Sequence, residues 1–267
     1  MTAVAIWPEA GQLWVVADTR LSGATGVLTD SASKIYALPV VCRPPNMLGT
    51  LLGSEPHFEG TFGVAFAGSS LAATHTIATA TSCLNQLAGV ETDGPSVREV
   101  AMFVQMIGSA IGYQIAAGMS RPRLEFEVAV FGWCRNLGSF AIYTLRPDPN
   151  ANPPMLCLGL EEHLPISSAD VVTLGDGGSR LSDERAKIIG VVHLKPKVAL
   201  ASILEREGPT GTVGRSLSIG TCVARPGGFQ IRSWAKATSN GVHLTYNGID
   251  VHDTTVGGYR INFRGYG

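Results

Sequence analysis

The sequence is poor in charged residues and contains no basic segment that could hold a polyanion. Charged side chains make up 15% of the 267 residues, and the formal net charge is −1. Nucleic acids and anionic membranes bind proteins through fields of lysine and arginine, so neither is expected as a partner. Hydrophobic residues reach 45%, which is enough to build a large core and argues against intrinsic disorder.

Cysteine and histidine are present but never clustered. The five cysteines include no CxxC pair, and the six histidines include no HxH or HxxxH pattern. Dispersed cysteines are typical of buried thiols in a reducing compartment, and a metal site needs more closely grouped ligands. We therefore expect no metal and no cofactor. The first residues also lack the basic segment of a secretory signal, so a cytoplasmic protein is expected.

One segment is long and free of charge. Residues 101–119, AMFVQMIGSAIGYQIAAGM, could span a bilayer by length, and Gly108 and Gly112 have GxxxG spacing. Polar side chains such as Gln105 and Gln114 would be costly in lipid, and no second span exists. We interpret this segment as a helix buried between protein layers, whose glycines let a neighbour approach closely.

The order of predicted elements indicates an α+β fold. Apolar runs at 2–7 and 13–17, joined by PEAG, predict a hairpin of buried strands. Helices are predicted at about 70–87, 95–119, 182–190 and 196–206, with runs of strands before, between and after the two pairs. This order predicts two stacked antiparallel sheets with helix pairs on both outer faces, a four-layer αββα sandwich.

No linker or repeat divides the chain, so residues 1–267 are expected to form a single domain. Within it, residues 39–61 are dense in proline and glycine and predict an inserted excursion. Further strands are expected from about residue 241 to the end of the sequence.

Three residues near the start stand at equal intervals. Thr2, Asp18 in the stretch ADTR and Lys34 in SASKIYAL are separated by sixteen and sixteen residues. This double interval resembles the N-terminal threonine hydrolases of the proteasome β-subunit family, which include the bacterial HslV peptidase. The long segment at 39–61 and the extra C-terminal strands favour a divergent bacterial proteasome homologue over HslV itself. The resemblance implies an N-terminal nucleophile (Ntn) hydrolase fold and a threonine-type peptidase.

The chemistry of such a site explains these residue types. A threonine hydroxyl is a weak nucleophile until a base takes its proton, and a free α-amine, with a pKa of about 8, can be that base. The Lys34 ammonium would lower the pKa of the amine, and Asp18 would hold Lys34 in place. This mechanism requires that Met1 be removed, so that Thr2 carries the free amine.

The resemblance also assigns residues further along the chain. Gly68 ends a strand before a helix, and its N–H would hold the oxyanion, since a helix N-terminus offers free donors and positive charge. Ser218 matches a serine of the family. Two positions depart from the pattern: Asp176 lies in the glycine-rich turn where the family has a serine, with Ser179 as an alternative, and Arg215 stands where an aspartate is usual.

Substrate binding in this family is by addition of an extended peptide to exposed strands. The resemblance implies that the substrate-binding residues are Arg20, Leu21, Ser22, Ala32, Tyr36, Phe66, Ser69 and Ser70. It also implies peptide or unfolded protein as substrate, a homo-oligomeric ring or stacked double ring, and possible service by an ATPase that unfolds substrates.

Two other functions stay open at this point. The chain could be a catalytically silent ring or scaffold subunit, which Asp176 and Arg215 would favour. It could also be an Ntn amidohydrolase that acts on a small amide.

Overall fold

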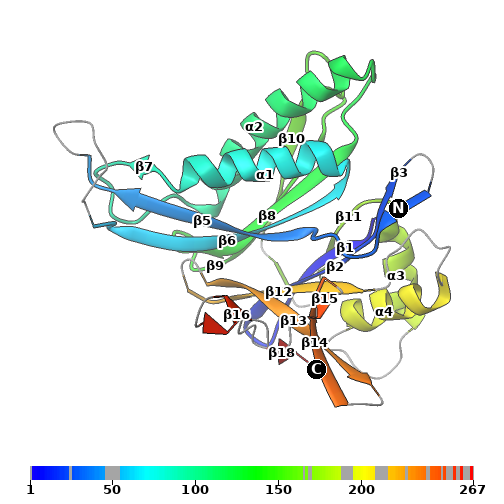
Figure 1. The fold of residues 1–267 in the computed structure, drawn as a ribbon. Coiled ribbons are helices and arrows are strands. Elements are labelled where there is room, and N and C mark those ends of the chain that lie inside the picture. Colours follow the sequence, from blue (N-terminus) through cyan, green and yellow to red (C-terminus); the bar gives the residue numbers. More distant parts are fainter. Residues whose placement is uncertain are drawn as a thin grey trace.

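A computed structural model describes the chain except for residues 1, 24–25, 46–54, 165, 168–169, 188–194, 208–215, 226–227, 239–240, 248, 251–254, 257–258, 261–264 and 267. The described residues form a mixed α+β fold with four helices, an eight-stranded sheet, a six-stranded sheet and two short hairpins (Figure 1). The α+β class expected from the sequence is confirmed.

The eight-stranded sheet begins with the predicted N-terminal hairpin. Strand β1 (Val4–Glu9) pairs with β2 (Gln12–Asp18), with Val4 opposite Ala17. Ala10 and Gly11 both have positive φ, the conformation of a tight two-residue hairpin turn. The strand order is β11-β1-β2-β12-β13-β14-β15, with β18 beside β13. The remaining strands are β11 (Val172–Leu174), β12 (Leu217–Val223), β13 (Phe229–Thr238), β14 (Gly241–Tyr246), β15 (Ile249–Asp250) and β18 (Gly265–Tyr266).

The six-stranded sheet has the order β10-β9-β8-β6-β5-β7. Its strands are β5 (Ile35–Arg43), β6 (Phe58–Gly68), β7 (Leu87–Ala88), β8 (Phe126–Cys134), β9 (Ser139–Pro147) and β10 (Leu158–His163). The two short hairpins are β3 (Leu21–Gly23) with β4 (Gly26–Thr29), and β16 (Thr255–Val256) with β17 (Tyr259–Arg260).

The segment 39–61 differs from the expected excursion at both of its ends. Strand β5 continues to Arg43 and pairs with β6 from Ile35↔Ala65 to Cys42↔Phe58, so residues 39–43 and 58–61 belong to a long hairpin. Residues 46–54 lie outside the described residues. Strand β5 is an edge strand at Pro39, because its pairing with β7 begins only at Cys42. Sheet edges are among the few places that tolerate proline.

Helices α1 (Ser70–Leu84) and α2 (Val97–Gly118) cover the six-stranded sheet. Helix α2 begins at a capping box, in which Ser96 and Glu99 exchange hydrogen bonds. It is long and apolar enough to cross a membrane, but one face of it packs into the core of this sheet. A Cβ at Gly108 would lie 2.8 Å from Leu158 Cδ1, so the glycine permits the close contact that the sequence predicted.

Helices α3 (Gly177–Lys187) and α4 (Lys195–Glu207) cover the eight-stranded sheet, where Leu181 and Leu200 pack against Trp7 and Trp14. A third core lies between the two sheets. There Phe131 of one sheet and Phe229 of the other meet edge to face at 5.5 Å. Figure 1 shows the two helix pairs on opposite sides of the paired sheets.

The ends of several strands meet at one place. Thr2 precedes β1, Asp18 ends β2, and Lys34 directly precedes β5. Gly68 ends β6 before α1, and Gly175 follows β11. The fold therefore gathers residues from five parts of the chain at one edge of the molecule.

Candidate active site

Thr2, Asp18 and Lys34 are brought together. The Lys34 ammonium donates to both carboxylate oxygens of Asp18 at 2.9 Å and to the Thr2 hydroxyl at 3.3 Å. The side chains of Asp18 and Lys34 are both 0% exposed, whereas Thr2 is half-buried. A buried ion pair thus ends at a hydroxyl that solvent can reach.

Asp18 is fixed by the backbone on both sides of it. Its carboxylate accepts hydrogen bonds from the N–H of Ala3 at 2.9 Å and of Arg20 at 3.1 Å, in addition to those from Lys34. The N–H of Asp18 in turn donates to the Ala3 carbonyl. A buried carboxylate is costly unless it is paired and hydrogen-bonded, and Asp18 meets both conditions.

Burial lowers the pKa of Lys34 from the ordinary 10.5, although the neighbouring Asp18 carboxylate acts in the opposite direction. The Arg20 guanidinium lowers the pKa of Lys34 further. Because the charged form is disfavoured by desolvation, this lysine gives up its proton more readily than an exposed lysine.

A glycine-rich turn lies against Thr2. The Gly177 N–H donates to the Thr2 carbonyl at 3.1 Å, and a Cβ at Gly175 would lie 2.3 Å from that same oxygen. Gly175 also has φ of +77°, so glycine is required there for two reasons. Asp176 lies exposed between the two glycines. The turn therefore holds the backbone of Thr2, and its Asp176 lines the cavity into which Thr2 opens.

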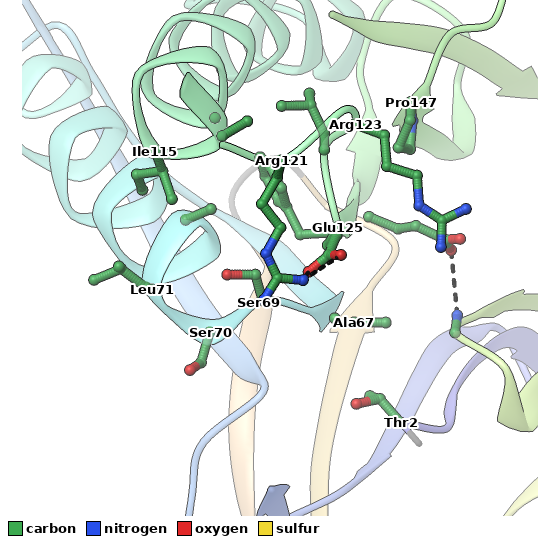
Figure 2. Close-up of a pocket in the computed structure, with 18 of the residues that line it drawn as sticks. Thr2, Ala67, Ser69, Ser70, Leu71, Ile115, Arg121, Arg123, Glu125 and Pro147 are labelled. Atoms are coloured by element: carbon green, nitrogen blue, oxygen red, sulfur yellow. Dashed lines mark hydrogen bonds and ion pairs between the residues drawn. The ribbon is translucent and has the colours of Figure 1, made fainter. Parts of the chain in front are cut away.

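Thr2 opens into a cavity of about 810 Å³ (Figure 2). Figure 2 shows Thr2 below Ala67, at the end of β6, with Ser69 and Ser70 across the cavity. Gly68 lines the same cavity and has φ of +90°, and a Cβ there would lie 2.1 Å from the Glu125 carbonyl. The junction between β6 and α1 thus requires glycine at Gly68.

The N-terminus of α1 faces this cavity. Ser69 is the N-cap residue, and its side chain makes no capping hydrogen bond within the described part of the chain. The backbone N–H of Ser69 donates to the Glu125 carbonyl. A helix start without a capping side chain leaves N–H donors and the positive end of the dipole available to an anion.

Most of the residues expected at the site line this cavity. They are Thr2, Arg20, Leu21, Ser22, Gly68, Ser69, Ser70 and Asp176. The Arg20 guanidinium, however, is 2% exposed and is held by the Asp30 carboxylate at 2.6 Å. Arg20 therefore braces the β3–β4 hairpin instead of reaching toward a substrate.

Four expected site residues lie elsewhere. The rings of Tyr36 and Phe66 stack at 6.2 Å in the core between the six-stranded sheet and its helices, because their side chains point to that face of the strands. Ala32 is outside the cavity lining, and its N–H donates to the Thr19 carbonyl. None of these three residues lines this cavity, so their expected part in substrate binding stays a prediction that the cavity does not support.

Ser218 is the fourth of these residues. It is buried on β12 opposite Ala17, and its hydroxyl donates to the Asn247 side-chain oxygen. No hydrogen bond joins Ser218 to Thr2 or Lys34 among the described residues. Arg215 and the side chain of Ser179 lie outside the described residues, so the interpretations of these two positions remain predictions.

Sequence analysis missed two cross-strand ion pairs beside the site. Arg20 and Asp30 flank the β3–β4 hairpin, and Glu127 and Arg146 flank the pairing of β8 with β9. The Glu127 carboxylate lies 3.5 Å from Arg146 and accepts the Gly175 N–H at 3.2 Å. Both pairs would have been predicted from the register of their hairpins, since residues just beyond paired strand ends face each other. Among the described residues no cluster of three histidine, cysteine or acidic side chains could hold a metal ion.

Comparison with known proteins gives a fold relationship. No protein-family model matches the sequence, and no curated protein does. Similar solved structures include the helical assembly of the Anbu complex from Pseudomonas aeruginosa, with 16% identity, a TM-score of 0.55, and 82% of this chain and 80% of that chain covered. Anbu (ancestral beta-subunit) from Yersinia bercovieri has 12% identity, a TM-score of 0.58 and 86% of each chain covered. A Gly-1 mutant of Anbu from Hyphomicrobium sp. strain MC1 has 16% identity, a TM-score of 0.55, and 86% and 84% covered.

These structures correct the family expected from the sequence. The chain has an Anbu-like fold, and Anbu proteins are proteasome-like in fold but form a distinct family from the HslV-like threonine hydrolases. The expectation that the chain is a member of the proteasome β-subunit or HslV-like threonine hydrolases is therefore wrong. Identities of 12–16% establish the fold alone.

Proposed function

We propose that the chain is an N-terminal threonine hydrolase that cleaves amide bonds in peptides, within a homo-oligomeric assembly. The observation that carries this proposal is the position of the Lys34 ammonium, 3.3 Å from the Thr2 hydroxyl and 2.9 Å from Asp18, at the wall of a cavity. The succession of helix pair, sheet, sheet and helix pair supports assignment to the four-layer Ntn sandwich.

The reaction would proceed through an ester. Thr2 Oγ attacks the substrate carbonyl carbon while its proton passes to a base, and the resulting oxyanion is held by the Gly68 N–H and the α1 dipole. Collapse of the tetrahedral intermediate breaks the C–N bond, and the proton goes to the leaving amine. Water then hydrolyses the ester by the same route and restores the threonine.

Two groups are candidates for the base. One is the α-amine of Thr2, which becomes free if Met1 is removed. The other is Lys34, which lies within reach of the hydroxyl and whose lowered pKa increases the fraction present as neutral amine. In the second case Asp18 is a positioning residue that keeps Lys34 directed at Thr2.

The substrate would lie extended between two strands that line the cavity. One is the segment with Leu21 and Ser22, and the other is the segment from Ala67 to Ser69. Backbone hydrogen bonds to both would bind a peptide largely independently of its sequence.

Intact-mass spectrometry with a peptide boronate or epoxyketone tests the proposal. We expect loss of Met1 and a single adduct that maps to Thr2. Thr2→Ala should abolish the adduct, whereas Ser82→Ala, which removes an exposed hydroxyl of α1 outside the cavity lining, should retain it. Full retention of Met1 together with absence of any adduct would reject the enzymatic proposal.

A catalytically silent assembly subunit is the second candidate. It is favoured by Asp176, whose carboxylate beside Thr2 would hold a free amine in its protonated form, and by the helical assembly described for the Pseudomonas aeruginosa Anbu complex. Light scattering and negative-stain microscopy would detect an assembly in either case. An assembly whose subunits all keep Met1 and take no adduct would support this second candidate.

A further inference from the structure

The cavity wall carries more charge than the proposed reaction uses. Its described lining includes four arginines and three acidic residues, namely Arg20, Arg121, Arg123, Arg146, Glu125, Glu127 and Asp176. Charges in a substrate cavity either neutralise one another or select the charge of the ligand. An arginine that is paired with a carboxylate of the protein is neutralised, whereas an arginine without such a partner can bind a charged ligand.

Three of the four arginines are held by the protein. Arg20 is bound by Asp30, and Arg121 is bound by both carboxylate oxygens of Glu125. Arg146 lies 3.2 Å from Glu161 and 3.5 Å from Glu127, and it donates to the Thr173 carbonyl at 2.8 Å. Each of these three arginines is therefore already paired with a carboxylate within the fold, although the buried Nε of Arg146 makes no hydrogen bond among the described residues.

Arg123 differs from the other three. It is exposed on the loop between α2 and β8, and no hydrogen bond or ion pair joins it to any residue that the structure describes. Figure 2 shows Arg121 and Arg123 on the side of the cavity away from Thr2. A guanidinium offers five N–H donors in a planar fork that fits a carboxylate. The cavity thus contains one arginine whose fork is available to a ligand.

The surroundings of Arg123 strengthen its preference for an anion. The apolar side chains of Ile115, Met119, Leu124 and Met155 line the same cavity and reduce the hydration of a bound charge. Asp176, in the turn that contacts Thr2, would repel a carboxylate placed beside the nucleophile. An acidic ligand group is therefore favoured at the Arg123 wall, away from the Asp176 carboxylate.

We propose that Arg123 forms a subsite for a carboxylate of the substrate, away from the bond that is cleaved. This inference rests on the proposed function only in taking the cavity as the peptide-binding site. The carboxylate is either the side chain of an aspartate or glutamate or the C-terminal carboxylate of a short peptide. Arg123 is a binding residue in this proposal and takes no part in the bond-breaking steps.

Binding to the Thr2→Ala variant tests the subsite without cleavage. The probes are acetylated, amidated alanine hexapeptides with one glutamate at each position in turn, their glutamine counterparts, and hexaalanine as free acid and as amide. We expect at least one glutamate peptide, or the free acid, to bind roughly three- to ten-fold more tightly than its neutral counterpart, as for a partly exposed charged pair. Fluorescence anisotropy of labelled peptides measures this ratio.

Adding Arg123→Ala to the Thr2→Ala variant should reduce the ratio of affinities for charged and neutral peptides to about one. Arg123→Glu should weaken binding of the glutamate peptides below that of their glutamine counterparts, and should favour the same hexapeptides with lysine in place of glutamate. Arg135→Ala is the matched control, because Arg135 is exposed, pairs with Asp93 and lies outside the cavity lining. Equal binding of charged and neutral peptides, no binding of any peptide, or a preference that survives Arg123→Ala would each overturn the subsite. An Arg123-dependent preference in a protein whose Thr2 never takes an adduct would uphold the subsite and reject the hydrolase. Adduct formation on Thr2 without an Arg123-dependent preference would uphold the hydrolase and reject the subsite.

Discussion

Replacing Lys34 with methionine should destabilise the fold strongly, because it leaves Asp18 buried without a counter-ion. Both side chains are 0% exposed in the ion pair. Breaking a buried pair costs about 3–5 kcal/mol, and Asp18 keeps two backbone N–H donors, which places the expected loss near the lower end, at about 3 kcal/mol. For a protein with a typical unfolding free energy of about 5–15 kcal/mol, this is a large fraction.

The assay is urea unfolding followed by tryptophan fluorescence at one fixed protein concentration. The midpoint should fall while the slope of the free energy against urea stays the same. Lys187→Met is the control and should cost less than about 1 kcal/mol, since the Lys187 side chain is 65% exposed and its partner Glu184 keeps Arg206 as a second counter-ion. The double variant Asp18→Asn with Lys34→Met should recover part of the loss, because it leaves no unpaired charge.

A loss of less than about 1 kcal/mol for Lys34→Met would refute the reasoning, because a buried, unpaired Asp18 cannot be that inexpensive. An equal loss in the single and double variants would also count against it. That result would mean that the methionine perturbs packing and that the charge of Asp18 plays no part.

Three further outcomes are expected. Gly68→Ala should lower the free energy of unfolding by about 3 kcal/mol in the same urea assay, because the φ of Gly68 is +90° and a Cβ would lie 2.1 Å from the Glu125 carbonyl oxygen. The control is Gly118→Ala, which has open space around it and should change the free energy of unfolding by no more than about 1 kcal/mol. Exposed Cys83 should react with a thiol reagent in the native protein, whereas burial raises the pKa of Cys222 to about 11, so mass mapping should find it labelled only after unfolding. Folding lowers the pKa of Lys34 from 10.5, so just below pH 10.5 the unfolded state binds more protons than the folded state. The stability of the wild type relative to Lys34→Met should therefore rise as the pH approaches 10.5 from below, and a falling difference would contradict the lowered pKa.

The parts of the fold that the sequence predicted are those with local signals. The predicted start of α2 near residue 95 has a local cause, since Ser96 and Glu99 form a capping box within four residues. The meeting of Thr2 with Asp18 follows from the N-terminal hairpin, since the pairing of Val4 with Ala17 places the start of β1 beside the end of β2. Short-range geometry was sufficient for both.

The parts that could not be predicted depend on distant segments. Tyr36 and Phe66 lie on strands that are buried on both faces, so hydrophobic alternation gives no indication of which face looks toward the helices. The bond from Ser218 to Asn247 joins strand β12 to the turn after β14, in a sheet whose register no local pattern specifies. The same holds for the family, because a shared spacing of three residues does not separate Anbu-like chains from HslV-like ones.

The carboxylate of Asp18 ties the assembly of the proposed catalytic group to the completion of folding. That single group accepts hydrogen bonds from its neighbour Arg20 and from Ala3 and Lys34, which belong to two other stretches of the chain. A nascent polypeptide in which any one of these stretches has not yet docked has no ammonium group beside its threonine. Reactivity would then be a property of the finished molecule only, and no immature form could attack its neighbours.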